Sequence, residues 1–148
     1  MRWTPLTDHL IVGGRLEVPD WLELWQLGVR AELNLQLEEP QRFFGAREPE
    51  AYLWLPVEDF TSPNVMQMVV AADFIQACVA HERPVYVHCY HGVGRSPLVC
   101  AAYLMRHQGL APNAAWDYIA QRRPFVGLND AQRAGLEAFA HWLQNGRP

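Results

Sequence analysis

The sequence contains no lysine: all twelve of its basic side chains are arginine, and sixteen acidic side chains give a formal net charge of −4. A mildly acidic chain without a basic block is poorly suited to neutralising many nucleic-acid phosphates, so we expect no nucleic-acid partner. The absence of lysine also makes every long cationic side chain a planar, permanently charged guanidinium. An arginine at a functional site would therefore act as a rigid fork of N–H donors.

Long hydrophobic runs are also missing. The longest apolar-rich segment, residues 65–80, is interrupted by Gln67, Asp73 and Gln76, which a membrane span tolerates poorly. Residues 1–5 carry no apolar stretch of the kind found in a signal peptide. We therefore expect no membrane insertion and a cytoplasmic protein.

Cysteine is scarce, with only Cys78, Cys89 and Cys100. The odd count excludes a complete disulfide framework, and the spacing matches neither a zinc finger nor a zinc ribbon. Pairing Cys89 with His91 as metal ligands is a weak alternative, because two ligands without a second pair do not make a tetrahedral site. We expect no metal and no cofactor.

The 148 residues are half hydrophobic and 19% charged, which suits one domain, residues 1–148, with one buried core. Hydrophobic patterning predicts strands at residues 9–12, 31–37, 52–57 and 84–88, and helices at 20–28, 64–82, 95–108, 112–122 and 130–144. Residues 38–49 are predicted to form a loop. Because strands and helices interleave, we expect a three-layer α/β/α fold around a mostly parallel sheet.

The first predicted helix carries two local signals. Asp20 and Glu23 form a capping pair, with Asp20 as the N-cap. Trp21, Leu24 and Trp25 share one face, which we interpret as core rather than as a platform for a ligand.

The most informative segment, residues 88–97, reads HCYHGVGRSP and lies between a buried strand and a helix. A turn at this point directs successive backbone N–H groups inward, and the helix adds its positive N-terminal end. Gly92 and Gly94 allow the unusual torsions and close approach of a tight cradle. This loop is therefore predicted to bind a dianionic oxyanion between the central strand and the following helix.

Cys89 lies where those amides stabilise a thiolate, so we expect a nucleophile rather than a buried structural cysteine. Arg95 begins the helix and is expected to hold two phosphate oxygens with its fork. Ser96 is expected to donate its hydroxyl to the sulfur, and His88 to hold the loop rather than act as a base. The residues expected to surround the bound phosphate are Tyr90, His91, Gly92, Val93, Gly94 and Arg95.

The pattern His88-Cys89, five residues, Arg95-Ser96 resembles the signature of the cysteine-dependent protein tyrosine phosphatases, and residues 92–95 look most like the dual-specificity branch. Similarity to that branch continues over residues 6–14, 27–35 and 123–130, so the resemblance covers nearly the whole chain. It implies a small phosphatase-like domain that works without a cofactor. The position of Cys89 past the midpoint is unlike the low-molecular-weight tyrosine phosphatases.

The resemblance also implies a general acid, an aspartate on a loop about thirty residues before the cysteine. Asp59 lies thirty residues before Cys89, although it lacks the Trp-Pro-Asp triplet of many tyrosine phosphatases. Glu58 is a rival acid. A pair of solvated carboxylates in a turn is the alternative without function.

Several supporting roles remain open at this point. In the family, an arginine at about the position of Arg122 and Arg123 braces the phosphate loop. Favourable pairing of these charges with the C-terminus of the preceding helix explains both residues equally well. Asn129 either orients the loop or the acid, or caps a helix. In some relatives a second cysteine forms a disulfide with the oxidised nucleophile, a role open to Cys78 or Cys100.

The sequence thus predicts a phosphomonoester hydrolase acting through a phosphocysteine on a phosphorylated protein or small phosphomonoester. Phosphotyrosine is the leading substrate, with phosphoserine and phosphothreonine also accepted. A phosphoinositide or other non-protein phosphate is the alternative, although Tyr90, His91 and Val93 add no fixed charge for a polyanionic head group. A phosphate-binding adaptor without turnover is a third reading.

Overall fold

A computed structural model describes residues 2–41, 43 and 47–146. Within them the strands are β1 (Trp3–Pro5), β2 (Leu10–Gly13), β3 (Ala31–Gln36), β4 (Ala51–Val57) and β5 (Val85–His88). They form one sheet in the order β1-β2-β5-β3-β4. Only the β1–β2 pair is antiparallel among these neighbours, so the predicted mostly parallel sheet is confirmed.

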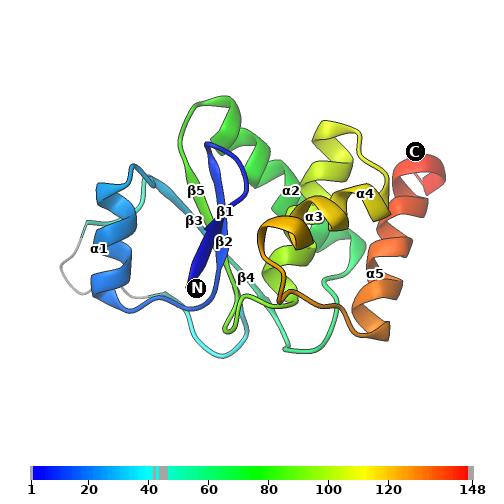
Figure 1. Ribbon diagram of the computed structural model, residues 1–148, viewed down its shortest axis with the longest axis horizontal. Coiled ribbons are helices and arrows are strands. Elements are labelled where there is room, and N and C mark those ends of the chain that lie inside the picture. The colour runs from blue at the N-terminus through cyan, green and yellow to red at the C-terminus, as the bar shows by residue number, and fades with distance from the viewer. Residues whose placement is uncertain (1, 42, 44–46, 147–148) are drawn as a thin grey trace.

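The helices lie on both faces of this sheet (Figure 1). Helix α1 (Val18–Gln26) covers one face, and the other face carries the helices α2 (Val65–Ala80), α3 (Arg95–Gln108), α4 (Pro112–Arg122) and α5 (Asp130–His141). A short π-helical turn, residues 142–146, follows α5. The predicted three-layer α/β/α arrangement is therefore confirmed.

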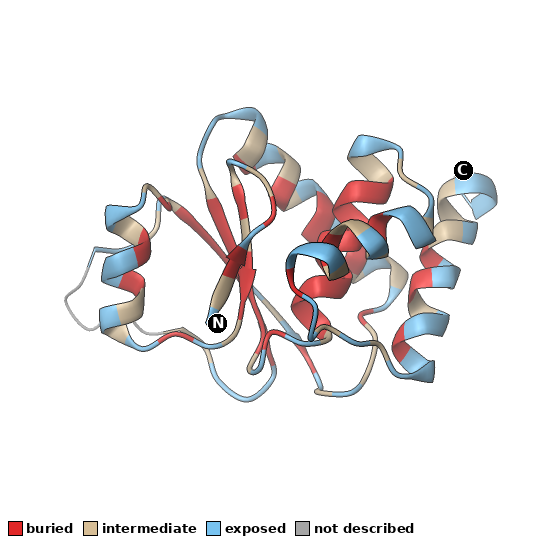
Figure 2. Cartoon of the chain, viewed as in Figure 1, coloured by how far each residue is buried: buried red, intermediate tan, exposed pale blue. Residues whose placement is uncertain are grey.

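The larger core lies between the sheet and α2 to α5, where α3 is buried along most of its length (Figure 2). A smaller core on the opposite face contains Trp21 and Leu24 of α1, packed near Tyr86 of β5. The aromatic face of α1 is thus core, as predicted. Because both of its faces are covered, β5 is an uninterrupted apolar and aromatic run before His88.

Strand β5 enters the sheet last but lies at its centre, between β2 and β3. The chain passes from β2 to β3 through α1, leaving the place that β5 later fills. The carboxyl end of β5 is therefore a topological switch point, where open α/β sheets bind their ligands.

Three details differ from the sequence prediction. Strand β1 was not expected, because a three-residue edge strand ending in Pro5 carries almost no periodic signal. Helix α1 begins at Val18 with Glu17 as N-cap, so Asp20 is not the cap; its carboxylate instead accepts the Glu17 backbone N–H at 2.9 Å. The last helix leaves regular α geometry after His141.

The predicted loop at residues 38–49 has no helix or strand in its described part, which comprises residues 38–41, 43 and 47–49. The remainder of that prediction lies outside the described residues. Among the residues that the structure describes, no helix is long and apolar enough to span a bilayer.

Candidate active site

The loop after β5 forms the floor of a cavity of about 390 Å³. Its walls come from three separate segments: the loop itself, the turn after β4, and the start of α5. The lining residues are Asp59, Phe60, Cys89, His91, Val93, Gly94, Gly127, Asn129 and Gln132. The fold therefore assembles residues from distant parts of the chain around one cysteine.

The two loop glycines are required for different reasons. Gly92 has a φ of +70°, and a Cβ there would lie 2.6 Å from the Gly13 carbonyl carbon and 2.6 Å from the Arg123 guanidinium. Gly94 has a negative φ of −124°, but a Cβ there would approach the Gln132 side-chain nitrogen to 2.8 Å. Gly92 thus supplies the torsion and both supply the close approach.

Cys89 is 2% exposed, and its sulfur is surrounded by donors. The Gly92 N–H donates to Sγ at 3.2 Å, and the Ser96 hydroxyl lies 3.3 Å from Sγ. The same hydroxyl is 3.1 Å from the Gly13 carbonyl oxygen, to which it can donate. Since a hydroxyl has one proton, Ser96 can turn it toward the sulfur when charge develops there.

Arg95 is almost completely buried, and its guanidinium is held on one edge by a residue that the sequence did not indicate. Nη1 and Nη2 donate to the two Glu38 carboxylate oxygens at 2.7 and 2.9 Å, and Nη1 also donates to the Val57 carbonyl oxygen at 2.8 Å. The hydrogen bond from Arg95 lowers the pKa of the Glu38 carboxyl. This end of the fork is therefore fixed by Glu38.

The other edge of Arg95 lies beside Asp59, which lines the cavity, although Arg95 itself is not among the lining residues. Among the described residues, no hydrogen bond reaches its buried Nε, whose nearest anionic neighbour is the Asp59 Oδ1 at 3.4 Å. Guanidinium has five N–H donors, of which Glu38 and Val57 take three. The Nε–H and the second Nη2–H remain as a parallel pair, which is the geometry that matches two oxygens of one phosphate.

The two candidate acids occupy different environments. Asp59 lines the cavity, its side chain is 33% exposed, and it accepts the Phe60 backbone N–H at 2.9 Å. Glu58 is exposed and is not among the residues that line the cavity. Of the two, Asp59 is the one brought to the same cavity as Cys89.

The turn that carries Asp59 is tied to the start of α5. Asn129 Nδ2 donates to the Phe60 carbonyl oxygen at 2.8 Å, and Asn129 Oδ1 accepts the Gln132 backbone N–H at 2.8 Å as the N-cap of α5. Asn129 is therefore a helix cap, and its second hydrogen bond contacts the turn that carries Asp59. Phe60 has a φ of +66°, an uncommon conformation that this hydrogen bond helps to hold.

Gln132 is a further cavity residue that the sequence analysis did not identify. It is 4% exposed, and its Oε1 accepts the Asn129 backbone N–H at 3.1 Å. Its side-chain nitrogen lies against Gly94, so its amide reaches the cavity beside the loop.

The two adjacent arginines after α4 have separate roles. Arg123 is 1% exposed, and its guanidinium donates to the Gly92 carbonyl oxygen at 2.8 Å and to the Thr4 hydroxyl at 3.0 Å. Arg122 is exposed and lies 3.5 Å from the centre of the Tyr118 ring. Arg123 is therefore the arginine that braces the loop.

The remaining predicted loop residues differ in exposure. His88 is fully buried, and its Nδ1 lies 3.4 Å from the Cys89 carbonyl oxygen, consistent with holding the loop. His91 and Val93 line the cavity, whereas Tyr90 does not. The Tyr90 carbonyl oxygen accepts the Arg15 backbone N–H at 2.9 Å, which anchors the outer side of the loop.

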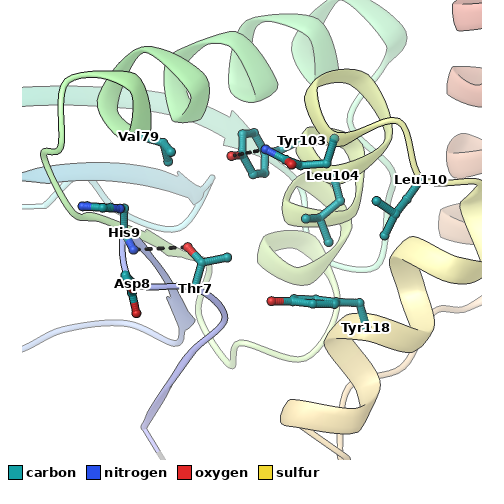
Figure 3. Close-up of a pocket in the computed structure, with 9 residues that line it drawn as sticks. Thr7, Asp8, His9, Val79, Tyr103, Leu104, Leu110 and Tyr118 are labelled. Atoms are coloured by element: carbon teal, nitrogen blue, oxygen red, sulfur yellow. Dashed lines mark hydrogen bonds between the residues drawn. The ribbon is translucent and has the colours of Figure 1, made fainter.

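A second cavity, of about 330 Å³, lies at the other end of the strands, where residues 7–9 approach α3 and α4 (Figure 3). Its phenols are already paired: the Tyr118 hydroxyl donates to the Leu6 carbonyl oxygen, and the Gln108 amide donates to the Tyr103 hydroxyl. None of its lining residues belongs to the catalytic cavity.

The other two cysteines are free and buried. Burial raises the pKa of the Cys78 thiol to about 11 and raises that of Cys100 as well. Neither thiol is therefore activated as a nucleophile. Among the described residues, no group of three or more histidine, cysteine, aspartate or glutamate side chains is arranged to hold a metal ion.

Comparison with known proteins connects this geometry with one family. The family model described as the dual specificity phosphatase catalytic domain matches residues 18–141. The phosphatidylglycerophosphate phosphatase PTPMT2 of Arabidopsis thaliana is 30% identical over 146 residues, covering 93% of this chain and 62% of the relative. Mouse dual specificity protein phosphatase 1 is 31% identical over 139 residues, covering 85% of this chain and 36% of the relative.

Solved structures show the same fold. Human DUSP28 superposes with a TM-score of 0.85 at 25% identity, covering 97% of this chain and 99% of the other. PTPMT1 superposes with a TM-score of 0.83 at 22% identity, covering 96% of each chain. The chain spans 62% of the length of the Arabidopsis relative and 36% of the mouse relative, so their whole-protein activities are not transferred by similarity alone.

Proposed function

Because this chain belongs to the dual specificity phosphatase family, we propose that it hydrolyses phosphate monoesters through a covalent phosphocysteine at Cys89. The observation that carries the proposal is the loop geometry. Cys89 Sγ accepts the Gly92 N–H beside the Ser96 hydroxyl, while Arg95 Nε lies 3.4 Å from Oδ1 of Asp59, which lines the same cavity. A nucleophile and a phosphate-binding fork are thereby held together in one anion-binding turn.

In the first step, the Cys89 thiolate attacks phosphorus and the bond to the leaving oxygen breaks. Arg95 Nε and Nη2 donate to two equatorial phosphate oxygens, and the loop amides neutralise the charge that develops there. Asp59 donates its proton to the departing oxygen, which otherwise would leave as an alkoxide or phenoxide. Glu38 keeps the guanidinium in its plane during this step.

In the second step, Asp59 accepts a proton from water as the water attacks phosphorus and the sulfur–phosphorus bond breaks. The Gln132 amide is placed to orient that water from the wall of the cavity. Ser96 turns its hydroxyl to the departing thiolate. Inorganic phosphate is released and both catalytic groups return to their starting protonation states.

The cavity favours a single phosphate on an apolar leaving group. Phe60 and Val93 form part of its rim, with side chains that are 73% and 37% exposed. Arg95 approaches the cavity beside Asp59, and no further arginine is among the described residues that line it, so a second phosphate would find no lining cation of its own. Phosphotyrosine in a protein is therefore the leading substrate, and phosphoserine and phosphothreonine, whose side chains are shorter, are further substrates.

A non-protein phosphate is the second candidate, and one comparison favours it. PTPMT2, which matches 93% of this chain, is named as a phosphatidylglycerophosphate phosphatase, and PTPMT1 has been solved in complex with PI(5)P. A panel of phosphotyrosine, phosphoserine and phosphothreonine peptides, phosphatidylglycerophosphate and phosphoinositides separates the two. Highest kcat/KM on a lipid phosphate would replace the protein-substrate assignment.

We further propose that residues 1–148 form one catalytic domain and that it acts in a reducing cytoplasm, where Cys89 stays reduced. Its three cysteines are all free and buried, which supports that compartment.

The direct test is turnover of an aryl phosphate in the presence of a chelator. Wild-type protein is expected to be active and to be inhibited by vanadate, whereas Cys89→Ser should bind vanadate or phosphate without turnover. Activity retained in Cys89→Ser would exclude the phosphocysteine. Binding without turnover by the wild-type protein on every substrate of the panel would identify a phosphate-binding adaptor.

A further inference from the structure

A buried glutamate lies behind the catalytic loop, on the α1 side of the sheet. Strand β3 alternates leucines, which face the larger core, with Glu32, Asn34 and Gln36, all of which are nonetheless buried. Glu32 is 0% exposed. A carboxyl group in such a place is expensive unless it is paired or protonated.

The nearest ionisable partner of Glu32 is the residue that precedes the nucleophile. Its Oε2 lies 3.5 Å from His88 Nε2, and His88 is also 0% exposed. Among the described residues, no hydrogen bond reaches either Glu32 carboxylate oxygen or His88 Nε2. Glu32 and His88 are therefore each other's available partners.

The opposite nitrogen of the same ring lies by the catalytic cysteine, with Nδ1 3.4 Å from the Cys89 carbonyl oxygen. A carbonyl oxygen can only accept, so a favourable contact there requires a proton on Nδ1. The contact between Nε2 and the Glu32 carboxyl requires a second proton between those two groups. The Glu32–His88 pair thus satisfies both contacts only when it holds two protons in total.

We propose that Glu32 is a positioning residue for the catalytic cysteine, keeping His88 as an imidazolium that donates from Nδ1 to the Cys89 carbonyl and from Nε2 to the Glu32 carboxylate. The inference rests on the proposed function for its catalytic meaning. The second proton is assigned to the ring because imidazole is in general more basic than a carboxylate. The buried pair is then neutral overall, with its positive end toward the Cys89 backbone carbonyl.

Other titratable groups around the pair do not supply this charge. Tyr86 stacks on the His88 ring with centroids 5.4 Å apart, and Tyr52 lies on the adjacent strand β4. Burial raises the pKa of both phenols, so both stay neutral through the working range. Arg123 acts on the other side of the loop, through Gly92. Glu32 is therefore the anion that can hold a proton on His88.

The first experiment measures the protonation of His88 directly, in ¹⁵N-histidine-labelled full-length protein by NMR. At pH 7 both ring nitrogens of wild-type His88 should carry protons. In Glu32→Gln the ring should become neutral with one proton, because a carboxamide cannot balance an imidazolium. A neutral His88 ring in the wild-type protein would overturn the proposal.

The second experiment follows the rate of Cys89 alkylation by iodoacetamide against pH, which needs no phosphatase turnover. Loss of the nearby cation in Glu32→Gln should move the midpoint upward by about one pH unit, which is an approximately tenfold slower alkylation below the midpoint. The acid limb of kcat/KM on an aryl phosphate should move with it. Glu32→Asp, which keeps the charge, should restore part of the shift.

Gln36→Leu is the matched control, since it removes another buried polar side chain from the same face of β3 without touching His88. Its alkylation midpoint should equal that of the wild-type protein. Glu32→Val tests a purely structural role: altered thermal stability with an unmoved alkylation midpoint in both Glu32→Gln and Glu32→Val would contradict the proposal. A wild-type protein inactive on all phosphates would instead count against the proposed function, while the alkylation shift would stand.

Discussion

At the scale of single residues, Arg95 must satisfy two anions at once. One edge of its guanidinium is occupied by Glu38, and the edge formed by Nε and Nη2, where Asp59 Oδ1 lies 3.4 Å from Nε, is the one proposed to bind phosphate. A lysine ammonium has three donors around one point and cannot present two parallel pairs. Retaining the charge is therefore not sufficient at this position.

Arg95→Lys is accordingly expected to lower kcat/KM on an aryl phosphate by about 10²–10³-fold, the loss typical of removing a donor to a developing oxyanion. Circular dichroism should show a folded protein. Arg122→Lys, at the exposed arginine that stacks on Tyr118, is the control and should retain near-normal turnover. Equal activity in both variants would mean that the phosphate does not use the Arg95 fork.

The assignment of the acid makes a second residue-scale prediction. Asp59→Asn should slow hydrolysis of phosphates with alkyl or poor aryl leaving groups by roughly 10²–10⁴-fold, because those groups need a proton to depart. Activated aryl phosphates should be affected far less. Glu58→Gln is the adjacent control with an exposed side chain, and the same leaving-group dependence in that variant would move the assignment by one residue.

Residues 88–96 could be predicted from the sequence because the whole anion-binding turn is contiguous, and its residue types at that spacing are chemically specific. Glu38 could not, since it reaches Arg95 across 57 positions from a loop with no periodic pattern. Gln132 was missed for a different reason: a glutamine in an amphipathic helix is expected to lie on the exposed face. The one available signal for Glu38 was its position: it is an acidic residue just after the predicted strand 31–37, and β3 runs parallel to β5, the strand that precedes Cys89.

At the scale of elements, the start of α5 links helix capping to the acid-bearing turn. Asn129 caps α5 through Oδ1 and holds the Phe60 carbonyl through Nδ2. Asn64 caps α2 with the same geometry, accepting the Gln67 backbone N–H at 2.8 Å, and lies outside the catalytic cavity. The chain therefore contains a matched pair of caps, of which one contacts the site.

Asn129→Asp and Asn64→Ala use this pair to separate the two roles. The aspartate retains a capping oxygen but loses the donor to Phe60, so we expect little change in thermal stability and a turnover lower by about ten- to a hundredfold. Asn64→Ala should lose about 1 kcal/mol of stability and keep its turnover. If turnover changes only in proportion to thermal stability in both variants, Asn129 acts as a helix cap and has no role in positioning the Asp59 turn.

The long elements were predictable from sequence to within a few residues, because α2, α3 and β5 have strong apolar patterns and clear end signals. Strand β1 was not, since its pairing with β2 is decided by tertiary contact over three residues. The N-cap of α1 was misplaced for a different reason. Two acidic residues, Glu17 and Asp20, stand three positions apart, and only the backbone conformation decides which one is the cap.

At the scale of the whole molecule, a net charge of −4 coexists with the proposed site for a dianion. Backbone amides, the start of α3 and Arg95 converge at one loop, and the carboxylates of Glu38 and Asp59 lie beside Arg95. Binding of an anion is thus a local property that the overall charge does not predict. The same arrangement makes folding stability depend on a carboxylate next to the site.

Glu38 contributes that dependence through its lowered pKa, caused chiefly by the hydrogen bond from Arg95. A carboxyl group with a lower pKa in the folded state adds stability that is complete above its ordinary value of 4.5 and is lost as pH falls through the folded value. Glu38→Gln should therefore lower Tm at pH 7, because the buried Arg95 loses its anionic partner. As the pH falls below 4.5 and then through the lower folded-state pKa of Glu38, the wild-type carboxyl also becomes neutral, so the two Tm values should converge.

Thermal unfolding of both proteins from pH 7 to pH 3 measures this convergence, and Asp73→Asn serves as the control. Burial raises the pKa of Asp73, but the hydrogen bonds from Arg106 and His107 together with their charges outweigh burial, so the net shift is downward. The Tm of Asp73→Asn should therefore also converge with that of the wild-type protein at low pH. Because Asp73 lies on the surface of α2 away from the cavity, its loss should leave turnover unchanged, whereas Glu38→Gln should reduce turnover as well. A Tm difference for Glu38→Gln that is constant across the range would show that the Glu38–Arg95 pair is not the source of the acid sensitivity.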